Sequence, residues 1–343
     1  MHDTDIASLR LASQQIDAPR FDDPAALLAH MGALQAQDFA SALLAIGLRV
    51  RGATASTVRA AFDTHAIVRS WLLRGTLHAV PSTDLRWMLA LLGQRNVAGV
   101  AGRFQRLGLD DLIIAKAHKL AARALDGSPP RTRAHLFDIF KANGIETAEQ
   151  RGNQILWRLA HEGLLCCAGF DGAETTFALL DDVVPASHAL PRDEALARLG
   201  QRYFSSHGPA SAADFAWWAG LTQADAKRAC AAADGLAEHD GLWMAAGAAP
   251  AKPATAIHLL PGYDEYLLGY KDRGAVLADH HATHLVPGGN GIYKPMLLVN
   301  GQIRGTWQRA NGDIAAAPFE PLPRGSSRAL AAALKQVKAF WAA

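Results

Sequence analysis

The chain has 343 residues, of which 50% are hydrophobic, and this composition excludes an intrinsically disordered protein. Its apolar runs, such as LLAIGLRV at residues 43–50, are far shorter than the ~18 residues that a membrane-spanning helix needs. The net charge of +2 is too small to indicate a polyanionic partner by itself. The composition therefore predicts a globular protein of several domains.

The N-terminal segment MHDTDIASLR carries acidic residues where a secretory signal would be basic and then apolar. The cysteines, Cys166, Cys167 and Cys230, have a number and a spacing that fit neither a disulfide framework nor a zinc site. We therefore expect a cytoplasmic protein whose cysteines are small buried fillers.

Residues 1–82 show helical patterns followed by a hairpin. Residues 6–15 have apolar positions at helical spacing, and residues 23–35 begin with Asp23 as N-cap and Pro24 at the first helical position. A third helix is expected over 54–66, after which strand-like residues turn at Gly75. This order is typical of a winged helix, a variant of the helix-turn-helix.

Two further units of similar layout follow connecting helices at residues 83–128. Residues 129–190 contain helices and then two strands that meet at a glycine-containing turn, which predicts a second winged helix. Residues 191–252 predict a third, in which Ser211 caps one helix, Gly220 ends it and Thr222 caps the next. No exact sequence period accompanies these units, so their similarity lies in the order of helices and strands.

Residues 253–343 predict a small β-rich C-terminal domain. The segment PMLLVNGQIRGTWQR alternates strand residues around Asn300-Gly301, a pair typical of two-residue hairpin turns. A terminal helix is expected over SRALAAALKQVKAFWAA. The predicted fold class is α+β and mainly α, with tandem winged-helix units followed by this domain.

Four segments match one protein family, in the family's order. They are ALQAQD at 33–38, VRSWLLRGTLHAV at 68–80, LLPGYDEYLLGYKDR at 259–273 and GIYKPMLLVNGQIRGTWQR at 291–309. With them the chain resembles the AlkZ/YcaQ-like superfamily of winged-helix DNA glycosylases. The resemblance implies a fold arranged around a concave DNA channel, and an enzyme that removes alkylated purines from double-stranded DNA and unhooks interstrand cross-links. It implies no metal or organic cofactor.

The family's catalytic signature is a Gln-x-Gln or Gln-x-Asp element, which Gln35 and Gln37 match here. Positive charge develops on the deoxyribose as the N-glycosidic bond breaks, and a glutamine carbonyl oxygen can face that charge or orient a water. A glutamine is not a general base, so a nearby carboxylate would help. Asp38 follows directly, and Asp264 in the segment YDEY is a second candidate for the base.

Helix geometry leaves two arrangements of these residues open. In a regular α-helix, Gln35 and Gln37 point about 200° apart, whereas Gln35 and Asp38 share a face. The two glutamines converge only if the helix ends near Gln35 and the chain becomes extended. The alternative for the whole segment is a solvated helix end whose polar side chains cap backbone groups.

Further polar residues are candidates for contact with DNA phosphates, and a solvated surface is the alternative for each of them. Alternation along the expected hairpin would place Arg74, Thr76 and His78 on one face, although local hydrogen bonds are equally compatible with His78. The complete set is Arg69, Arg74, Thr76, His78, Arg151, Arg158, Lys294, Arg304 and Arg309.

The segment HHATH offers His280, His281 and His284, but its surroundings in the sequence supply no carboxylate or cysteine that completes a zinc set, so no metal site is expected. We expect a monomer. We also expect a monofunctional glycosylase, because no lysine stands beside the glutamines to form a Schiff base. The alternative function is DNA binding without catalysis, as in a transcriptional regulator or a lesion binder.

Overall fold

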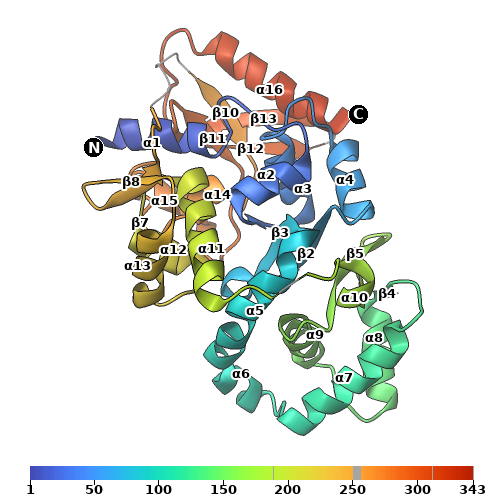
Figure 1. Cartoon of the computed structure of the whole chain (residues 1–343). Helices are drawn as coiled ribbons and strands as arrows, with labels where there is room; N and C mark the ends of the chain where they lie inside the picture. Colours follow the sequence, from blue (N-terminus) through green and yellow to red (C-terminus); the bar gives the residue numbers. More distant parts are fainter. Residues whose placement is uncertain (188, 250–255, 311, 343) are drawn as a thin grey trace. The chain divides into compact units, whose positions relative to one another are not determined.

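The computed structural model describes residues 1–187, 189–249, 256–310 and 312–342 (Figure 1). The chain divides into two compact units. Unit 1 comprises Met1–Ala60 and Leu196–Ala343, and unit 2 comprises Ala61–Ala195. The mainly helical fold with several small sheets agrees with the predicted fold class. The division into five domains stays a prediction. In the described ranges, no helix is long and apolar enough to cross a membrane.

Unit 2 is built from helices that pack on one antiparallel sheet. Its helices are α5 (Ser82–Gly99), α6 (Ala101–Arg106), α7 (Asp111–Leu125), α8 (Arg133–Ala142), α9 (Arg151–His161) and α10 (Leu180–Val183), with a 3-10 turn η1 (Leu73–Gly75). Its strands are β2 (Ile67–Trp71), β3 (Leu77–Pro81), β4 (Arg131–Thr132), β5 (Leu165–Asp171) and β6 (Glu174–Leu179), which lie in the order β3-β2-β5-β6-β4.

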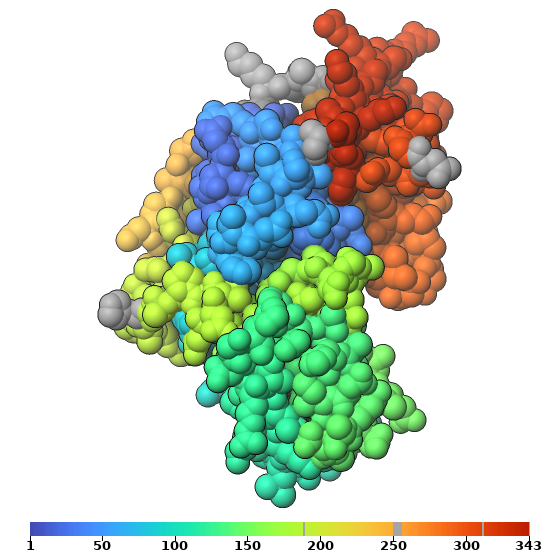
Figure 2. All heavy atoms as spheres, turned by 90° about the vertical axis from the view of Figure 1, so that its right-hand side faces the viewer, coloured from blue at the N-terminus to red at the C-terminus, as the bar shows by residue number. Residues whose placement is uncertain are grey.

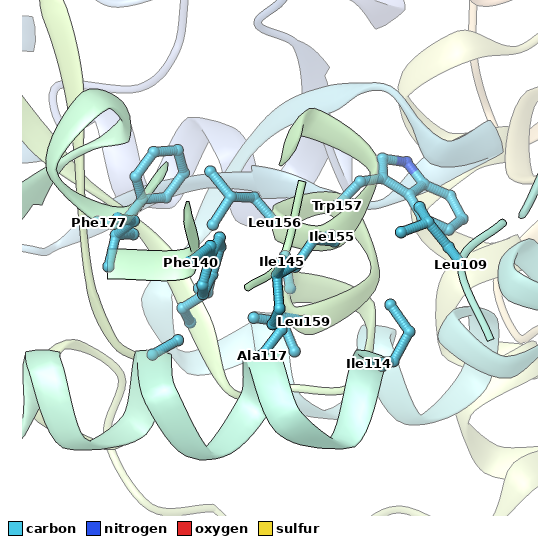
Figure 3. Packing of buried hydrophobic residues seen from close by; sticks show 14 of the residues in the cluster. Leu109, Ile114, Ala117, Phe140, Ile145, Ile155, Leu156, Trp157, Leu159 and Phe177 are labelled. Carbon is cyan, nitrogen blue, oxygen red and sulfur yellow. The ribbon is translucent and has the colours of Figure 1, made fainter. Parts of the chain in front are cut away.

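Within the predicted second winged helix, residues 129–190, the structure has the series β4, α8, α9, β5 and β6, and α7 from the predicted connecting helices precedes it. Strand β4 pairs with β6, so the short first strand closes the sheet formed by the wing. Asp110 accepts a hydrogen bond from the backbone N–H of Ile113 and thereby caps α7. Side chains of α7, α8, α9 and β6 meet in one apolar core, which includes Ile114, Phe140, Ile155 and Phe177 (Figure 3).

Unit 1 contains the N-terminal helices, the third helical series and the C-terminal sheet. Its helices are α1 (Asp3–Ser13), α2 (Pro24–Met31), α3 (Phe39–Gly47), α4 (Ala55–Asp63, which continues into unit 2), α11 (Arg192–His207, which begins in unit 2), α12 (Ala212–Ala219), α13 (Gln223–Ala232), α14 (Glu265–Leu268), α15 (Ala282–Leu285) and α16 (Ser327–Ala342). Its strands are β1 (Leu34–Gln35), β7 (Ala210–Ser211), β8 (Leu236–His239), β9 (Leu242–Ala245), β10 (Ile257–Leu260), β11 (Met296–Val299), β12 (Gln302–Ala310) and β13 (Asp313–Pro318), and 3-10 turns lie at η2 (Asp279–His281) and η3 (Pro287–Gly289).

The predicted third winged helix is the series α11, β7, α12, α13, β8 and β9, in which β7 pairs with β9. Its helix boundaries follow the caps expected from the sequence. Ser211 and Asp214 form a reciprocal capping box, Gly220 ends α12 with a φ of +70°, and Thr222 accepts from the backbone N–H of Asp225. The same order of elements occurs a third time from α2 to β3.

The C-terminal part of unit 1 contains the antiparallel sheet β10-β11-β12-β13. Asn300 and Gly301 join β11 to β12 with φ values of +52° and +79°, which confirms the predicted two-residue turn. Helix α16 lies along this sheet (Figure 1). Its Phe340 packs against Gly47 of α3, where a Cβ would overlap the ring. Figure 2 accordingly shows the C-terminal segment beside the N-terminal one.

Candidate active site

The segment from Gly32 to Asp38 is not helical. Helix α2 ends at Met31, because Gly32 adopts a φ of +79°, and α3 begins only at Phe39. A Cβ at position 32 would also lie 3.3 Å from the ring of Trp218. The helix that we expected over residues 23–35 is therefore shorter than predicted. Gly32 was the stop signal, and the helical spacing that continues after it was misleading.

Burial alternates along this extended segment. Leu34 and Ala36 are buried in the core, whereas Gln35 is half-buried and Gln37 is exposed. Leu34 and Gln35 form strand β1, and residues 37 and 38 form a bend before α3. Of the two arrangements left open by the sequence, the one in which Gln35 and Asp38 share a face of a continuing helix therefore does not occur, and a joint role of Gln35 and Gln37 stays a prediction.

Asp38 has a structural contact at the end of the same segment. It is the N-cap of α3, and its Oδ1 atom accepts a hydrogen bond of 2.7 Å from the backbone N–H of Ser41. The side chain is exposed. Burial, together with the negative charge of Asp38, raises the pKa of the nearby Tyr263 phenol. Asp38 therefore places a carboxylate next to the glutamines and at the N-terminus of a helix.

Asp264 is fully engaged inside unit 1. Its two oxygens accept bonds of 2.9 and 2.7 Å from the two terminal nitrogens of Arg49, and neither side chain is exposed. Asp264 also caps α14 by accepting from the backbone N–H of Tyr266. Arg49 donates further to the carbonyl of Ala45 and to the side chain of Gln14. These contacts argue against Asp264 as a general base, because neither oxygen is accessible to a water or a substrate.

The neighbouring Glu265 contacts the glutamine segment instead. Its Oε1 atom accepts a hydrogen bond of 2.8 Å from the backbone N–H of Gln35, and its Oε2 atom accepts one of 2.9 Å from the indole of Trp218. His207 lies 3.5 Å from Oε2, and burial lowers the pKa of its imidazole. The sequence offered adjacent acids at 264 and 265, and our choice of Asp264 overlooked Glu265. The sequence did contain a signal for a structural role of Glu265. This residue precedes the apolar residues Tyr266, Leu267 and Leu268, and a carboxylate buried among such residues needs a hydrogen-bond donor.

The wing of unit 2 holds candidate DNA contacts in different environments. Arg69 and His78 are buried, with Arg69 bonded to Thr175 and His78 bonded through Nδ1 to the carbonyl of Thr76. Arg74 lies in the turn with a φ of +51°, so it does not share a strand face with Thr76 and His78. The burial of Arg69 and His78 argues against phosphate contact by these two side chains.

The candidates on α9 are both engaged within unit 2. Arg151 donates to the backbone carbonyls of Glu146 and Leu107. Arg158 forms an ion pair with Glu162 one turn later on the same helix, and a longer one with Asp111. Both side chains are half-buried, so they hold α9 in place in addition to any contact with a phosphate.

The candidates of the C-terminal domain are more exposed. Lys294 and Arg309 are exposed, and the guanidinium of Arg309 lies 4.4 Å from the centre of the Trp341 ring. Arg304 is half-exposed and lies 3.7 Å from a carboxylate oxygen of Glu320. Arg309, Trp307 and Trp341 also line a hollow of about 430 Å³ beside the first turn of α3, where Ser41 contributes.

One cluster has the residue types of a metal site. His280, His281 and Glu320 bring ligand atoms within 4.8 Å of one another. Glu320, which lies about 40 positions after the histidines in the sequence, supplies the carboxylate of this cluster. However, the Arg304 guanidinium already lies beside this carboxylate, and zinc ligands at about 2.1 Å from the ion would have to move closer together. We attribute the cluster to ion pairing.

His161 on α9 predicts a pH dependence for unit 2. Burial lowers the pKa of His161 to about 4. Its Nδ1 atom donates to the carbonyl of Trp157, and Nε2 faces the amide of Asn96, so the neutral ring fits the site. Because the unfolded chain binds the proton at a normal pKa near 6.5, stability falls as the pH falls from about 6.5 to 4, by about 1.4 kcal/mol per unit.

Urea midpoints of the wild type and His161→Gln, measured at pH 7 and at pH 4.5, test this expectation. The variant is the less stable protein at pH 7, and the difference between the two midpoints shrinks at pH 4.5, because only the wild type must protonate His161. A difference that stays constant across this pH range would contradict it.

Comparisons with known proteins support one family. A family model described as DNA glycosylase AlkZ-like matches residues 28–340. An "Interstrand DNA cross-link repair glycosylase" of Streptomyces sahachiroi is 25% identical over 324 residues, covering 85% of this chain and 83% of that protein. The solved structure of the Streptomyces sahachiroi DNA glycosylase AlkZ aligns with a TM-score of 0.85 at 22% identity, over 99% of this chain and 97% of the other. The chain therefore belongs to the AlkZ-like DNA glycosylase family.

Proposed function

We propose that the chain is a monofunctional DNA glycosylase that hydrolyses the N-glycosidic bond of alkylated purines in double-stranded DNA. The observation that carries the proposal is that Gln35 and Gln37, which the regular helix geometry expected there would have kept apart, lie on a non-helical segment between Gly32 and Asp38. The relative described as an interstrand cross-link repair glycosylase supports bulky adducts and cross-links as substrates. We further propose that the enzyme acts as a monomer.

The chemistry follows from the charge of the substrate. A purine alkylated at N7 already carries a positive charge, so the electron pair of the N-glycosidic bond passes to the base, which leaves as a neutral molecule. Positive charge then appears on the deoxyribose. The side-chain oxygen of the exposed Gln37 stabilises that charge and orients the water that adds at C1′. The half-buried Gln35 contributes its side-chain amide, whose buried oxygen must turn outward to reach the sugar. This arrangement needs no protonation of the leaving base.

The water must lose a proton after it adds to C1′. A glutamine cannot accept this proton, and Asp264 is buried against Arg49. Asp38 remains, since its side chain is exposed and only its Oδ1 atom is held by Ser41. We assign the proton acceptor role to the other oxygen of Asp38. Residues 32–38 contain no lysine, which agrees with a hydrolytic enzyme whose glutamine segment supplies no Schiff-base nucleophile.

The test is release of the free base. The protein is incubated with a duplex that carries one N7-methylguanine, and with a second duplex cross-linked between two guanine N7 atoms. We expect free N7-methylguanine by chromatography, abasic sites that an abasic-site endonuclease converts to strand breaks, and no breaks without that endonuclease. Tight binding with no base release from either duplex would instead support a DNA-binding protein without catalysis.

A further inference from the structure

We infer that Glu265 is a positioning residue that fixes strand β1 and, through it, the side chains of Gln35 and Gln37. The inference depends on the proposed function, because Glu265 acts on the reaction only through these glutamines. Glu265 accepts a hydrogen bond from the backbone N–H of Gln35, and its other oxygen accepts from the indole of Trp218. Its side chain is fully buried, so it has no direct contact with DNA or water at the reacting carbon.

The position of Gln35 depends on its backbone. The Oε1 atom of Gln35 is buried and has no hydrogen-bond partner among the described residues. Besides the strand pairing of β1, this residue is held by the 2.8 Å bond from its backbone N–H to Glu265. A shift of β1 would therefore carry the Gln35 side chain with it, and Gln37 would follow two residues later.

Glu265 is itself held on both sides. Asp264 before it forms the buried pair with Arg49, which ties the start of α14 to the end of α3. Tyr266 after it donates its hydroxyl to the carbonyls of Gly301 and Ala7. Since both neighbours are anchored to other elements of unit 1, the carboxylate has little freedom to move. It is a rigid acceptor against which the strand can be aligned.

The two contacts of Glu265 require a carboxylate. The backbone N–H of Gln35 and the indole N–H of Trp218 donate to different oxygens. A carboxylate offers two acceptors, whereas a glutamine side chain would set its NH₂ group against one of these donors. The change from Glu265 to Gln keeps the shape of the side chain and removes one of the two bonds. It is therefore a test of alignment with little change in packing.

We expect Glu265→Gln to lower the single-turnover rate of N7-methylguanine release by roughly 10- to 100-fold, because misplacement of a reacting group by about 1 Å has effects of this size. The Kd for an undamaged duplex should change by less than about twofold. The matched control is Asp214→Asn. Asp214 is also a buried carboxylate that accepts from backbone N–H groups, those of Lys271 and Asp272, and no described contact joins it to β1.

Hydrogen exchange supplies a readout that does not require activity. In Glu265→Gln the amide of Gln35 should exchange faster than in the wild type, while amides of α16 keep their rates; in Asp214→Asn the amide of Gln35 should not change. The inference is wrong if that amide exchanges at the wild-type rate in Glu265→Gln, or if both variants lose activity in proportion to their loss of thermal stability. A wild type that releases no base, with faster Gln35 exchange in Glu265→Gln, would contradict the proposed function and leave the anchoring of β1 supported.

Discussion

Replacing Gln35 or Gln37 with Ala is expected to lower the single-turnover rate of N7-methylguanine release by about 100-fold each, the usual effect of removing one polar group that stabilises charge in a transition state. Neither change should alter folding. The backbone N–H that Glu265 accepts is still present in Gln35→Ala, and Gln37 is exposed. The rate is measured with enzyme in excess over a duplex that carries a single lesion, and the Kd for that duplex is measured separately.

Gln336→Ala is the matched control for both changes, because Gln336 is an exposed glutamine on α16. Its rate should equal that of the wild type. If both site variants retain more than half of the wild-type rate, the glutamines are not the catalytic element, even if base release itself is observed. The two single changes should also combine to less than the sum of their effects on the activation free energy, because the two side chains act on the same developing charge.

The same assay tests the role proposed for Asp38. Asparagine is also a good N-cap, so Asp38→Asn keeps an oxygen for the backbone N–H of Ser41 and removes only the proton acceptor. A rate that falls, while the Kd for the duplex stays unchanged, would agree with the proposal. An unchanged rate would show that the proton passes directly to solvent.

The second large effect concerns the buried pair of Arg49 and Asp264. We expect Arg49→Ala to lower the free energy of unfolding by about 3–5 kcal/mol, because it leaves the Asp264 carboxylate buried without a partner. Asp264→Asn should act in the same direction by leaving the Arg49 guanidinium without its counter-charge. Urea unfolding followed by tryptophan fluorescence measures both changes.

The chain offers a close control two residues away. Arg51 also forms two hydrogen bonds to one aspartate, Asp22, but both of these side chains are exposed. Arg51→Ala should therefore leave the urea midpoint almost unchanged, since solvent screens this pair. If Arg49→Ala and Arg51→Ala lower the free energy of unfolding by equal amounts, then the burial of the Arg49–Asp264 pair does not increase the effect of breaking it. If Asp264→Asn instead keeps full stability and loses base release, a direct catalytic role for Asp264 would have to be reconsidered.

Several features of the fold could be predicted from the sequence because they depend on neighbouring residues. The caps at Asp110, Ser211 and Thr222, and the turn at Asn300-Gly301, involve side chains and backbone groups a few positions apart. The extended conformation before Asp38 was also encoded locally, by Gly32. We gave the continuing apolar pattern more weight than the glycine, and thereby predicted a helix that was too long.

The Gln-x-Gln segment could likewise be identified from the sequence, through the resemblance that it carries. Which side chains support it could not. Asp264 and Glu265 are adjacent and chemically similar, yet one pairs with Arg49 and the other accepts from Gln35, contacts that span 215 and 230 positions of the chain. The burial of Arg69 and His78 could not be predicted from the sequence either, because alternation along a strand does not tell which of its faces is covered.

The sequence by itself thus determined the series of helices and strands, the family and the pair of glutamines. The tertiary structure decided that these glutamines lie outside a helix and that Glu265 accepts from the backbone N–H of Gln35. The physical reason is the sequence separation of the interacting groups. Caps and tight turns satisfy backbone groups within a few residues, so the local sequence predicts them. A buried carboxylate is satisfied by whichever donors the fold brings next to it, and the local sequence does not identify those donors.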